Sequence, residues 1–277
     1  MTNDDGYTAK GIRTLAEIMT AFGQVHVVAP KKHESGMAMA VSLGLKQLAC
    51  KDFGEDEAGV HWTYLDATPA SCVKFGLNYP AFGSRPDIVL SGINHGSNAT
   101  TGALYSGTLG ATAEAALNGI PAIGVSLATS NPDADFSAVR EFFPRVFRTL
   151  TSFTPVPFGT YFNVNFPNLP APQIKGIRVT VMGMGHWEKE FEDWDPTRLE
   201  HLGITPELLG QSSVANALEG EKLYMMMGHY VDGENNHRRA DHHLLKEGYI
   251  TITAHKIDST DRDTFTRMIE DGLDKDF

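Results

Sequence analysis

Cysteine is scarce in this chain, with only Cys50 and Cys72 among its 277 residues. Two thiols cannot build a disulfide scaffold or a cysteine-based zinc site. Long hydrophobic runs are also missing, since no stretch approaches the roughly 18 apolar residues that a membrane span needs. Residues 1–5 have neither the basic nor the apolar region of a signal peptide. We therefore expect a cytoplasmic protein that does not contact a membrane.

Positively charged residues are outnumbered: the chain has 23 Lys and Arg residues and 34 Asp and Glu residues, which gives a net charge of −11. A surface this acidic repels a phosphate backbone, so we expect no nucleic-acid partner. A small phosphorylated substrate remains compatible with this charge, provided that its site supplies local positive charge. A bound cation is the simplest such source.

Short apolar runs alternate with stretches of helical periodicity through the first two-thirds of the chain. The runs predict strands at 25–28, 59–65, 87–90 and 122–127, and the periodic stretches predict helices at 12–22, 68–77, 108–117 and 136–150. This alternation favours an α/β fold with a mostly parallel sheet that helices cover on both faces.

The pattern changes in the last third, where strand-like runs at 161–166 and 177–182 precede a long polar stretch. The length of the chain suits one large domain. We interpret it as a single domain with three parts: an α/β core over 1–185, a β-rich protruding arm over 186–247, and a final strand with a C-terminal helix over 248–277.

The segment 3–6, which reads Asn-Asp-Asp-Gly, lies just before the first predicted helix. Its ordinary interpretation is a turn. However, the two carboxylates of Asp4 and Asp5 lie where a sheet fold of this kind binds its ligand. Adjacent carboxylates repel each other unless a cation lies between them, and hard divalent ions prefer such oxygen ligands.

A glycine-rich segment over 91–110, SGINHGSNATTGALYSGTLG, begins at the end of a predicted strand and finishes in a predicted helix. In this segment, the side chains of Asn94 and Asn98 offer neutral oxygen ligands. Ser106, Gly107 and Thr108 fall at the N-terminus of the helix, where unpaired N–H groups and a partial positive charge suit a phosphate. The segment matches neither the P-loop nor the GxGxxG pattern, and a purely structural loop is the alternative.

Other polar residues are weaker candidates. Ser35 follows a predicted strand and could ligate a cation or hold a phosphate, although a plain Ser-Gly turn is the alternative. His95 could polarise a phosphate oxygen, although a residue that merely lines the wall of the crevice is the more common case. Four histidines of the arm lack the HExxH spacing of a zinc site and are interpreted as solvated: His229, His237, His242 and His243.

Eight motifs taken together resemble those of the SurE family, the stationary-phase survival protein nucleotidases. They occur in the family's order and span nearly the whole chain. They are TNDDG at 2–6, VVAP at 27–30, SG at 35–36, ATPASCV at 67–73, SGINHGSN at 91–98, YSGTLGATAEA at 105–115, NVNFP at 163–167 and GYITITAH at 248–255.

The resemblance implies a metal-dependent phosphomonoesterase that hydrolyses nucleoside 5′- and 3′-monophosphates. It also implies a Rossmann-like three-layer core and a homodimer or homotetramer, assembled through the arm and an exchanged C-terminal helix. By motif position, the metal ligands are Asp4, Asp5, Ser35 and Asn94. By the same reasoning, the phosphate-binding residues are Asn98, Ser106, Gly107 and Thr108.

An all-oxygen ligand set favours one divalent ion, Mg²⁺ or Mn²⁺, over zinc. Asp4 and Asp5 are also the catalytic candidates, because either a metal-bound water or one of these carboxylates could attack the phosphorus. Two alternatives remain open at this point. One is a non-catalytic or weakly active nucleotide-binding relative, and the other is a phosphatase for short polyphosphate or another small phosphoester.

The chain departs from the family pattern ahead of TNDDG, where the family has a short apolar strand and this sequence has only Met1 and Thr2. Either the numbering starts late, or the sheet lacks its middle strand and the Asp pair is poorly held. The loop after VVAP also begins with Lys31, where the family usually has Asp.

Overall fold

A computed structural model describes the chain except for residues 45–46, 80–81, 132, 196, 198–217 and 276–277. Its core holds two sheets. The larger sheet has the strand order β4-β5-β6-β12-β7 and the smaller one β1-β3-β2. The strands of the larger sheet are β4 (Val89–His95), β5 (Ala122–Leu127), β6 (Thr160–Phe166), β7 (Ile177–Thr180) and β12 (Ile250–Lys256). Those of the smaller sheet are β1 (Val25–Pro30), β2 (Cys50–Glu55) and β3 (Val60–Leu65).

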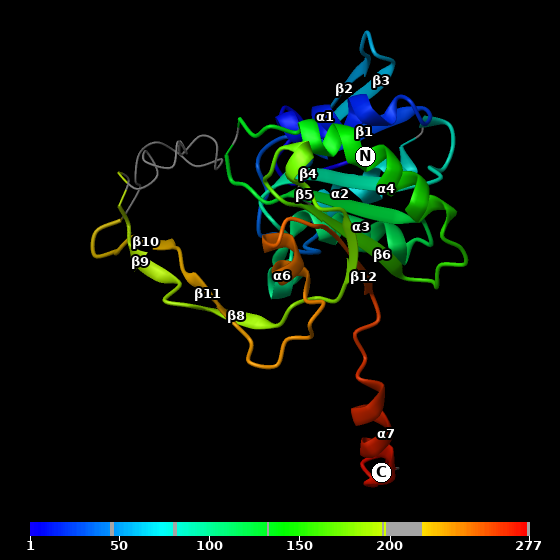
Figure 1. Ribbon diagram of the computed structural model, residues 1–277. Coiled ribbons are helices and arrows are strands. Elements are labelled where there is room, and N and C mark those ends of the chain that lie inside the picture. Colours follow the sequence, from blue (N-terminus) through cyan, green and yellow to red (C-terminus); the bar gives the residue numbers. More distant parts are fainter. Residues whose placement is uncertain (45–46, 80–81, 132, 196, 198–217, 276–277) are drawn as a thin grey trace.

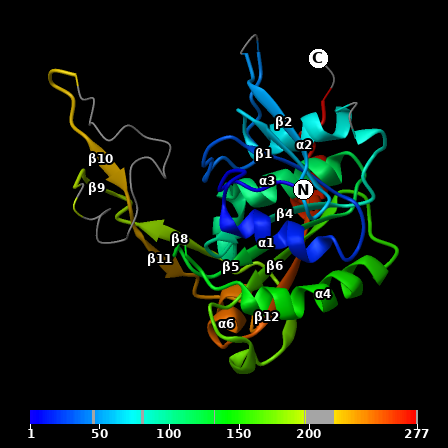
Figure 2. The same ribbon diagram turned by 90° about the horizontal axis from the view of Figure 1, so that it is seen from above.

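Most neighbouring strands are parallel, as the sequence predicts. The exceptions are the antiparallel pairs β6–β12 and β2–β3. Helices cover both faces (Figures 1 and 2), with α1 (Lys10–Met19) and α4 (Ser137–Ser152) on one side and α2 (Pro69–Asn78) and α3 (Gly107–Leu117) on the other. The predicted three-layer α/β core is therefore confirmed.

Local sequence explains where these helices begin and which side they bury. In α1 the apolar residues Ile12, Leu15 and Met19 recur at helical spacing, and all three are buried against the core. Helix α2 begins after Thr68, whose hydroxyl accepts a hydrogen bond from Ser71 N, and Pro69 occupies its first position. Helix α3 is buried on nearly all sides because it lies between the larger sheet and α2.

Only Met1 and Thr2 join the two sheets within the described part of the chain. Thr2 N donates to Leu90 O and Thr2 O accepts from Gly92 N, both at 3.0 Å, so Thr2 lies beside β4. On the other side, Met1 O accepts from Val28 N of β1 at 2.9 Å.

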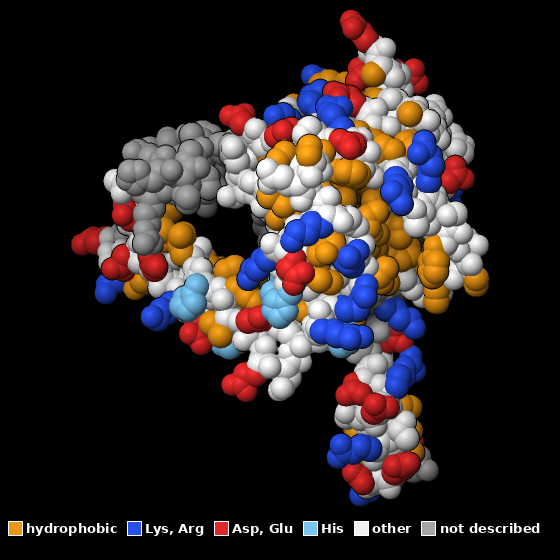
Figure 3. Space-filling view, viewed as in Figure 1, with side chains coloured by type: hydrophobic (Ala, Val, Ile, Leu, Met, Phe, Trp, Pro, Cys, Tyr) orange, Lys and Arg blue, Asp and Glu red, His pale blue; other side chains and the backbone are white. Residues whose placement is uncertain are grey.

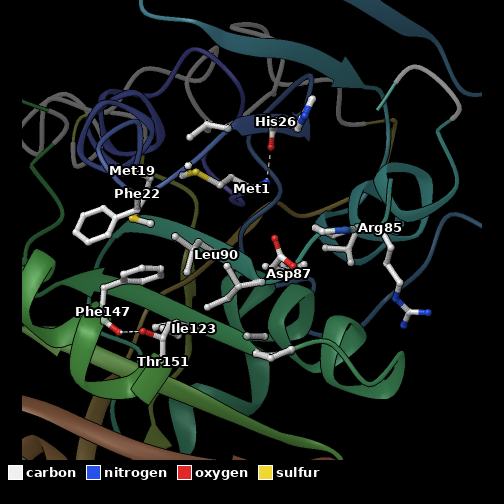
Figure 4. A pocket seen from close by; sticks show the side chains of 18 of the residues that line it. Met1, Met19, Phe22, His26, Arg85, Asp87, Leu90, Ile123, Phe147 and Thr151 are labelled. Carbon is white, nitrogen blue, oxygen red and sulfur yellow. Dashed lines mark hydrogen bonds between the residues drawn. The ribbon is translucent and has the colours of Figure 1, made fainter. Parts of the chain in front are cut away.

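Beyond this bridge, β1 and β4 border a cavity of about 690 Å³. Figure 4 shows the Met1 amine pointing to His26 O, with apolar side chains around it; those labelled are Met19, Phe22, Leu90, Ile123 and Phe147. Burial lowers the pKa of the Met1 amine to about 5. In the described structure the two sheets are therefore separate, and the backbone of residues 1–2 lies between them.

The arm projects from the core as an extended ribbon (Figure 1). Its strands are β8 (Gly185–Glu188), β9 (Phe191–Asp193), β10 (Tyr224–Met226) and β11 (His229–Asp232), in the antiparallel pairs β8–β11 and β9–β10. Residues 198–217 of the predicted arm lie outside the described residues. A short helix, α6 (Asp241–Lys246), leads from the arm back to β12.

The C-terminal segment leaves the core and ends in α7 (Arg262–Glu270), which contains no buried residue. The predicted C-terminal helix is therefore present, although shorter than expected. Figure 3 shows hydrophobic side chains among the charged ones on this projection. No helix among the described residues is both long and apolar enough to cross a bilayer. The described residues also form the short 3₁₀ helices η2 (Thr100–Tyr105) and η3 (Ala171–Gln173).

Candidate active site

Asp4 lies at the N-terminus of α3 and is only 3% exposed. Thr108 holds its carboxylate with two hydrogen bonds, one from the hydroxyl to Oδ1 at 2.6 Å and one from the backbone N–H to Oδ2 at 3.2 Å. Gly107 permits this approach, because a Cβ atom there would lie 2.9 Å from Asp4 Cβ and 3.1 Å from its Oδ2. The expectation of a poorly held carboxylate is thus wrong for Asp4.

Two histidines surround the neighbouring Asp5, whose side chain is 9% exposed. The Nδ1 atom of His95 lies 3.1 Å from Asp5 Oδ2. The backbone N–H of His95 donates to the same oxygen at 3.2 Å. His33 Nδ1 lies 3.5 Å from Asp5 Oδ1. Asp4 and Asp5 therefore have separate partners, Thr108 for the first and the two imidazoles for the second.

These environments move the pKa values of the two carboxyl groups apart. Burial and the charge of Asp5 raise the pKa of Asp4 to about 6, although the Thr108 hydrogen bonds oppose the rise. Burial also acts to raise the pKa of Asp5, but hydrogen bonds from His33 and His95 outweigh it and bring the value to about 2. Adjacent carboxylates with unlike pKa values are characteristic of functional sites.

The other two predicted metal ligands differ in placement. Asn94 is 7% exposed at the end of β4, and its Nδ2 donates to Gly96 O at 2.8 Å, which leaves Oδ1 as the free end of the amide. Ser35 is exposed, and in the described structure its hydroxyl has no hydrogen bond to either carboxylate. The loop carrying Ser35 does reach the site, because Glu34 N donates to Asp4 O at 2.7 Å.

A network of buried amides fixes the loop at Asn98. Asn98 N donates to Asn165 Oδ1 at 2.8 Å, and its Nδ2 donates to Ser126 Oγ at 2.9 Å. Asn163 Nδ2 donates to Asn98 O at 2.8 Å, and the two β6 asparagines are themselves hydrogen-bonded. The NVNFP motif therefore acts as the support on which this loop rests.

Three of the four predicted phosphate-binding residues, Ser106, Gly107 and Thr108, lie at the start of α3. Ser106 is the N-cap, and its Oγ accepts the N–H of Leu109 at 3.1 Å, so the hydroxyl hydrogen remains to donate to a ligand. Gly107 and Thr108 form the first turn, although Thr108 directs both of its donors to Asp4. Asp4, Ser106 and the first-turn amides thus lie together, as the motifs predict.

The donor set fits a hard divalent ion. Asp4, Asp5 and Asn94 provide two carboxylates and one amide oxygen, all nearly buried. Among the described residues, neither carboxylate forms an ion pair with Lys or Arg. The basic side chains in contact with Asp5 are those of His33 and His95. Two buried carboxylates without a cationic side chain are costly, and a bound cation would remove that cost.

Sequence analysis missed three residues that shape this site. His33 was not singled out, and His95 was assigned to the wall or to a phosphate oxygen, whereas both contact Asp5. The third is Asp241, which is fully buried and accepts the N–H of Thr100 at 3.1 Å in the loop ahead of Ser106. The histidines lie next to recognised motifs, so their position was a usable signal. No comparable signal in the sequence pointed to Asp241, because it is 141 residues from Thr100.

The fold and the site define an α/β protein with a buried carboxylate pair and a helix N-terminus at the carboxyl ends of parallel strands, the usual ligand position of such folds. A model of the SurE family, described as Survival protein SurE, matches residues 1–189. This chain belongs to the SurE family, which confirms the resemblance drawn from the motifs.

Individual relatives agree with this membership. A protein of Christiangramia forsetii named 5′-nucleotidase SurE is 36% identical over 261 residues, covering 94% of this chain and 91% of the relative. Another of the same name, from Cytophaga hutchinsonii, is 41% identical over 196 residues, 70% of this chain and 74% of the relative. The crystal structure of the SurE protein from Aquifex aeolicus superposes with a TM-score of 0.73 at 28% identity, covering 97% of each chain.

Proposed function

We propose that this protein is a metal-dependent phosphomonoesterase that releases phosphate from nucleoside 5′- and 3′-monophosphates. The observation that carries the proposal is the buried pair Asp4 and Asp5, which lies against the N-terminus of α3 and has no lysine or arginine partner in the part of the chain that the structure describes. The name 5′-nucleotidase SurE, borne by the curated relatives, supports the same reaction and the same class of substrate.

The metal ligands in this proposal are Asp4, Asp5, Asn94 and Ser35, and the ion is Mg²⁺ or Mn²⁺. When bound, such an ion polarises the phosphoryl group and lowers the pKa of a coordinated water. The protein contributes rigidity, because Thr108 fixes both oxygens of Asp4 and His95 fixes one oxygen of Asp5. Ser35 has to turn its exposed side chain toward the pair to join them.

The phosphate in this proposal lies over the first turn of α3, where Ser106, Gly107 and Thr108 are found, and Asn98 binds it from the loop that follows β4. The Ser106 hydroxyl and the first-turn N–H groups stabilise negative charge as it develops on the phosphoryl oxygens. Asp5 accepts a hydrogen bond from Nδ1 of His95, so in the neutral ring the buried Nε2 is an acceptor, and it has no hydrogen-bond partner within the described structure.

Oligomerisation is the second part of the proposal. Large apolar side chains are exposed on the arm and on α7: Phe191 at 69%, Tyr224 at 55%, Met226 at 69%, Phe265 at 52%, Met268 at 48% and Ile269 at 49%. A lone soluble chain rarely leaves so many on two projecting segments, whereas a neighbouring subunit would cover them. A homodimer or homotetramer built through these segments follows.

A phosphate-release assay on a panel of nucleoside monophosphates, with and without EDTA, tests the proposed reaction. We expect release in the presence of Mg²⁺ or Mn²⁺, its loss on chelation, and its return when the metal is restored. Asp4→Asn should lower the rate by orders of magnitude while the protein still folds. Release that persists after exhaustive chelation, or in Asp4→Asn, contradicts the metal-dependent mechanism.

A further inference from the structure

A second cluster of ligand-type side chains lies at the base of the arm, where β11 ends and α6 begins. Asp232 is the last residue of β11, and its two carboxylate oxygens each contact an imidazole. His242 Nε2 lies 2.9 Å from Oδ1, and His243 Nε2 lies 2.6 Å from Oδ2. The candidate ligand atoms of these three residues all lie within 4.8 Å of one another.

The sequence-based interpretation of the arm histidines as solvated is wrong for His242. Its side chain is 8% exposed, whereas that of His243 is 38% exposed and that of His229 is 56% exposed. Histidine side chains, pale blue in Figure 3, gather along the arm and at its base. His242 is buried because α6 packs against β12 and β7 of the core.

The protonation of His242 is unusual without a metal. In the neutral ring, Nε2 donates its only proton to Asp232, so the buried Nδ1 is left unprotonated and without a hydrogen-bond partner. This nitrogen lies 3.5 Å from Oδ1 of Asp241, so two acceptors face each other. A metal on Nε2 would move the proton to Nδ1, where the carboxylate of Asp241 accepts it. Metal-binding histidines commonly have such a carboxylate partner.

Asp241 is well suited to this supporting position. It is fully buried, and its carboxylate accepts the N–H groups of Thr100 at 3.1 Å, Gly183 at 3.0 Å and His242 at 2.8 Å. Gly183 also makes room for the ring, since a Cβ atom there would lie 2.2 Å from His242 Nδ1. The orientation of His242 is thus set from the side opposite Asp232.

We propose that Asp232, His242 and His243 bind a borderline-soft divalent transition-metal ion of the zinc class, at a site separate from Asp4 and Asp5. Two imidazoles and one carboxylate are a common three-residue set for such ions, with solvent completing the tetrahedron. Asp232 at 44% exposure and His243 at 38% leave that fourth position open to water.

The ligand charges agree with this assignment. Both oxygens of Asp232 lie within hydrogen-bond distance of an imidazole nitrogen, which suits an ionised carboxylate. Asn236 also donates its Nδ2 to Asp232 Oδ1 at 2.5 Å and helps to orient the group.

A bound ion would connect the arm to the loop ahead of the candidate active site. It would fasten the last arm strand, through Asp232, to α6, through His242 and His243. Asp241 continues the connection, because it holds the backbone of Thr100 in the segment that leads to Ser106. The position of the arm and that of the phosphate-binding loop would therefore depend on the same ion.

Titration with Co²⁺ tests the proposal, since tetrahedral Co²⁺ absorbs visible light and reports its own coordination. The full-length protein is first saturated with Mg²⁺, so that hard-ion sites are filled. We expect one saturable equivalent of tetrahedral Co²⁺, displaced by Zn²⁺, and a rise in Tm on Zn²⁺ addition. Both signals should be lost in His243→Gln and in Asp232→Asn, whose partly exposed side chains can change without unfolding the core.

Two variants serve as matched controls. His229→Gln removes an exposed histidine of β11 that pairs with Glu188, and Cys50→Ser removes the exposed thiol. Both should keep the full equivalent of Co²⁺. The proposal is overturned if wild-type protein shows no saturable Co²⁺ spectrum. It is also overturned if the spectrum survives in His243→Gln and Asp232→Asn, or disappears only in His229→Gln, Cys50→Ser or Asp4→Asn.

Discussion

Thr108 illustrates how one residue can hold a carboxylate of the candidate site with two donors. Its hydroxyl and its backbone N–H both donate to Asp4, so the residue fixes a candidate metal ligand. The sequence identifies Thr108 as a phosphate-binding residue, and that prediction remains open. The structure adds a second role, in which Thr108 positions the carboxylate for the cation.

The two roles of Thr108 predict different kinetic changes on Thr108→Val. If Thr108 acts mainly through Asp4, the Mn²⁺ concentration for half-maximal activity should rise by about 10–100-fold, as for other residues that support metal ligands. Thr108→Ser should restore the wild-type value because it keeps the hydroxyl. Thr149→Val, an exposed change on α4, is the control. An unchanged Mn²⁺ requirement with a raised KM would instead place Thr108 on the phosphate.

The raised pKa of Asp4 predicts how metal affinity depends on pH. Because Asp4 has a pKa of about 6 and must lose its proton to bind a cation, Mn²⁺ affinity should fall as the pH drops below about 6. Asp5 stays ionised in this range because its pKa is about 2. His33, whose pKa is raised by its hydrogen bond to Asp5, acts in the same direction when it is protonated.

Calorimetric titration of Mn²⁺ between pH 7.5 and pH 5 measures this dependence (the range brackets the pKa of Asp4 at about 6). The Asp4→Asn variant should bind weakly and lose most of the pH effect. Affinity that stays constant across the range would show that Asp4 does not ligate the ion.

Among the helices and strands, those with strong apolar patterns follow the sequence prediction closely. Helix α1 and strands β1 and β5 overlap the predicted segments 12–22, 25–28 and 122–127. Strand β4 (Val89–His95) meets the predicted strand 87–90 only at its start and continues into the glycine-rich segment. Strand β2 was missed because its side chains are almost all exposed and show no alternation. Helix α6 was missed because six residues are too few for a periodic signal.

The same contrast holds for the site. Asp4 and Thr108 were assigned to one site, as metal ligand and phosphate-binding residue, by the position of their motifs in the resemblance to the SurE family. The approach of His33 and His95 to Asp5 was not predicted, since it depends on how two separate loops fold over the edge of the sheet. Tertiary contacts between loops leave no periodic trace in a sequence.

The first turn of α3 gives a further test, because its backbone lies against Asp4. Gly107→Ala should cost most of the activity, since the new Cβ would lie 2.9 Å from Asp4 Cβ and 3.2 Å from Glu34 O. Helix propensity alone would favour alanine over glycine by about 0.5–1 kcal/mol.

The matched control is Gly102→Ala in η2 of the same segment, where the nearest atom to a new Cβ is Thr100 Oγ1 at 3.7 Å. Turnover and Tm of the two variants should be compared. Equal activity in Gly107→Ala and Gly102→Ala would mean that Asp4 does not need its present position.

For the assembled chain, the exposed apolar face of α7 predicts a specific oligomer contact. Phe265, Met268 and Ile269 lie on one side of the helix, each about half exposed. Replacing Phe265 and Ile269 together by Asp should reduce the mass measured by light scattering, while Thr266→Asp, also exposed, should not. A wild-type protein that is monomeric at micromolar concentration would contradict the proposed assembly.

The bridge formed by Met1 and Thr2 has a consequence for cooperativity. Because the two sheets share only this short backbone connection in the described structure, β1, β2 and β3 can open without breaking the ladder from β4 to β7. In native-state hydrogen exchange, we expect the amides of β1 and β3 to open at a lower free energy than those of β5 and β6. One common opening energy for all four strands would show that the packing of α1 across both sheets makes them a single unfolding unit.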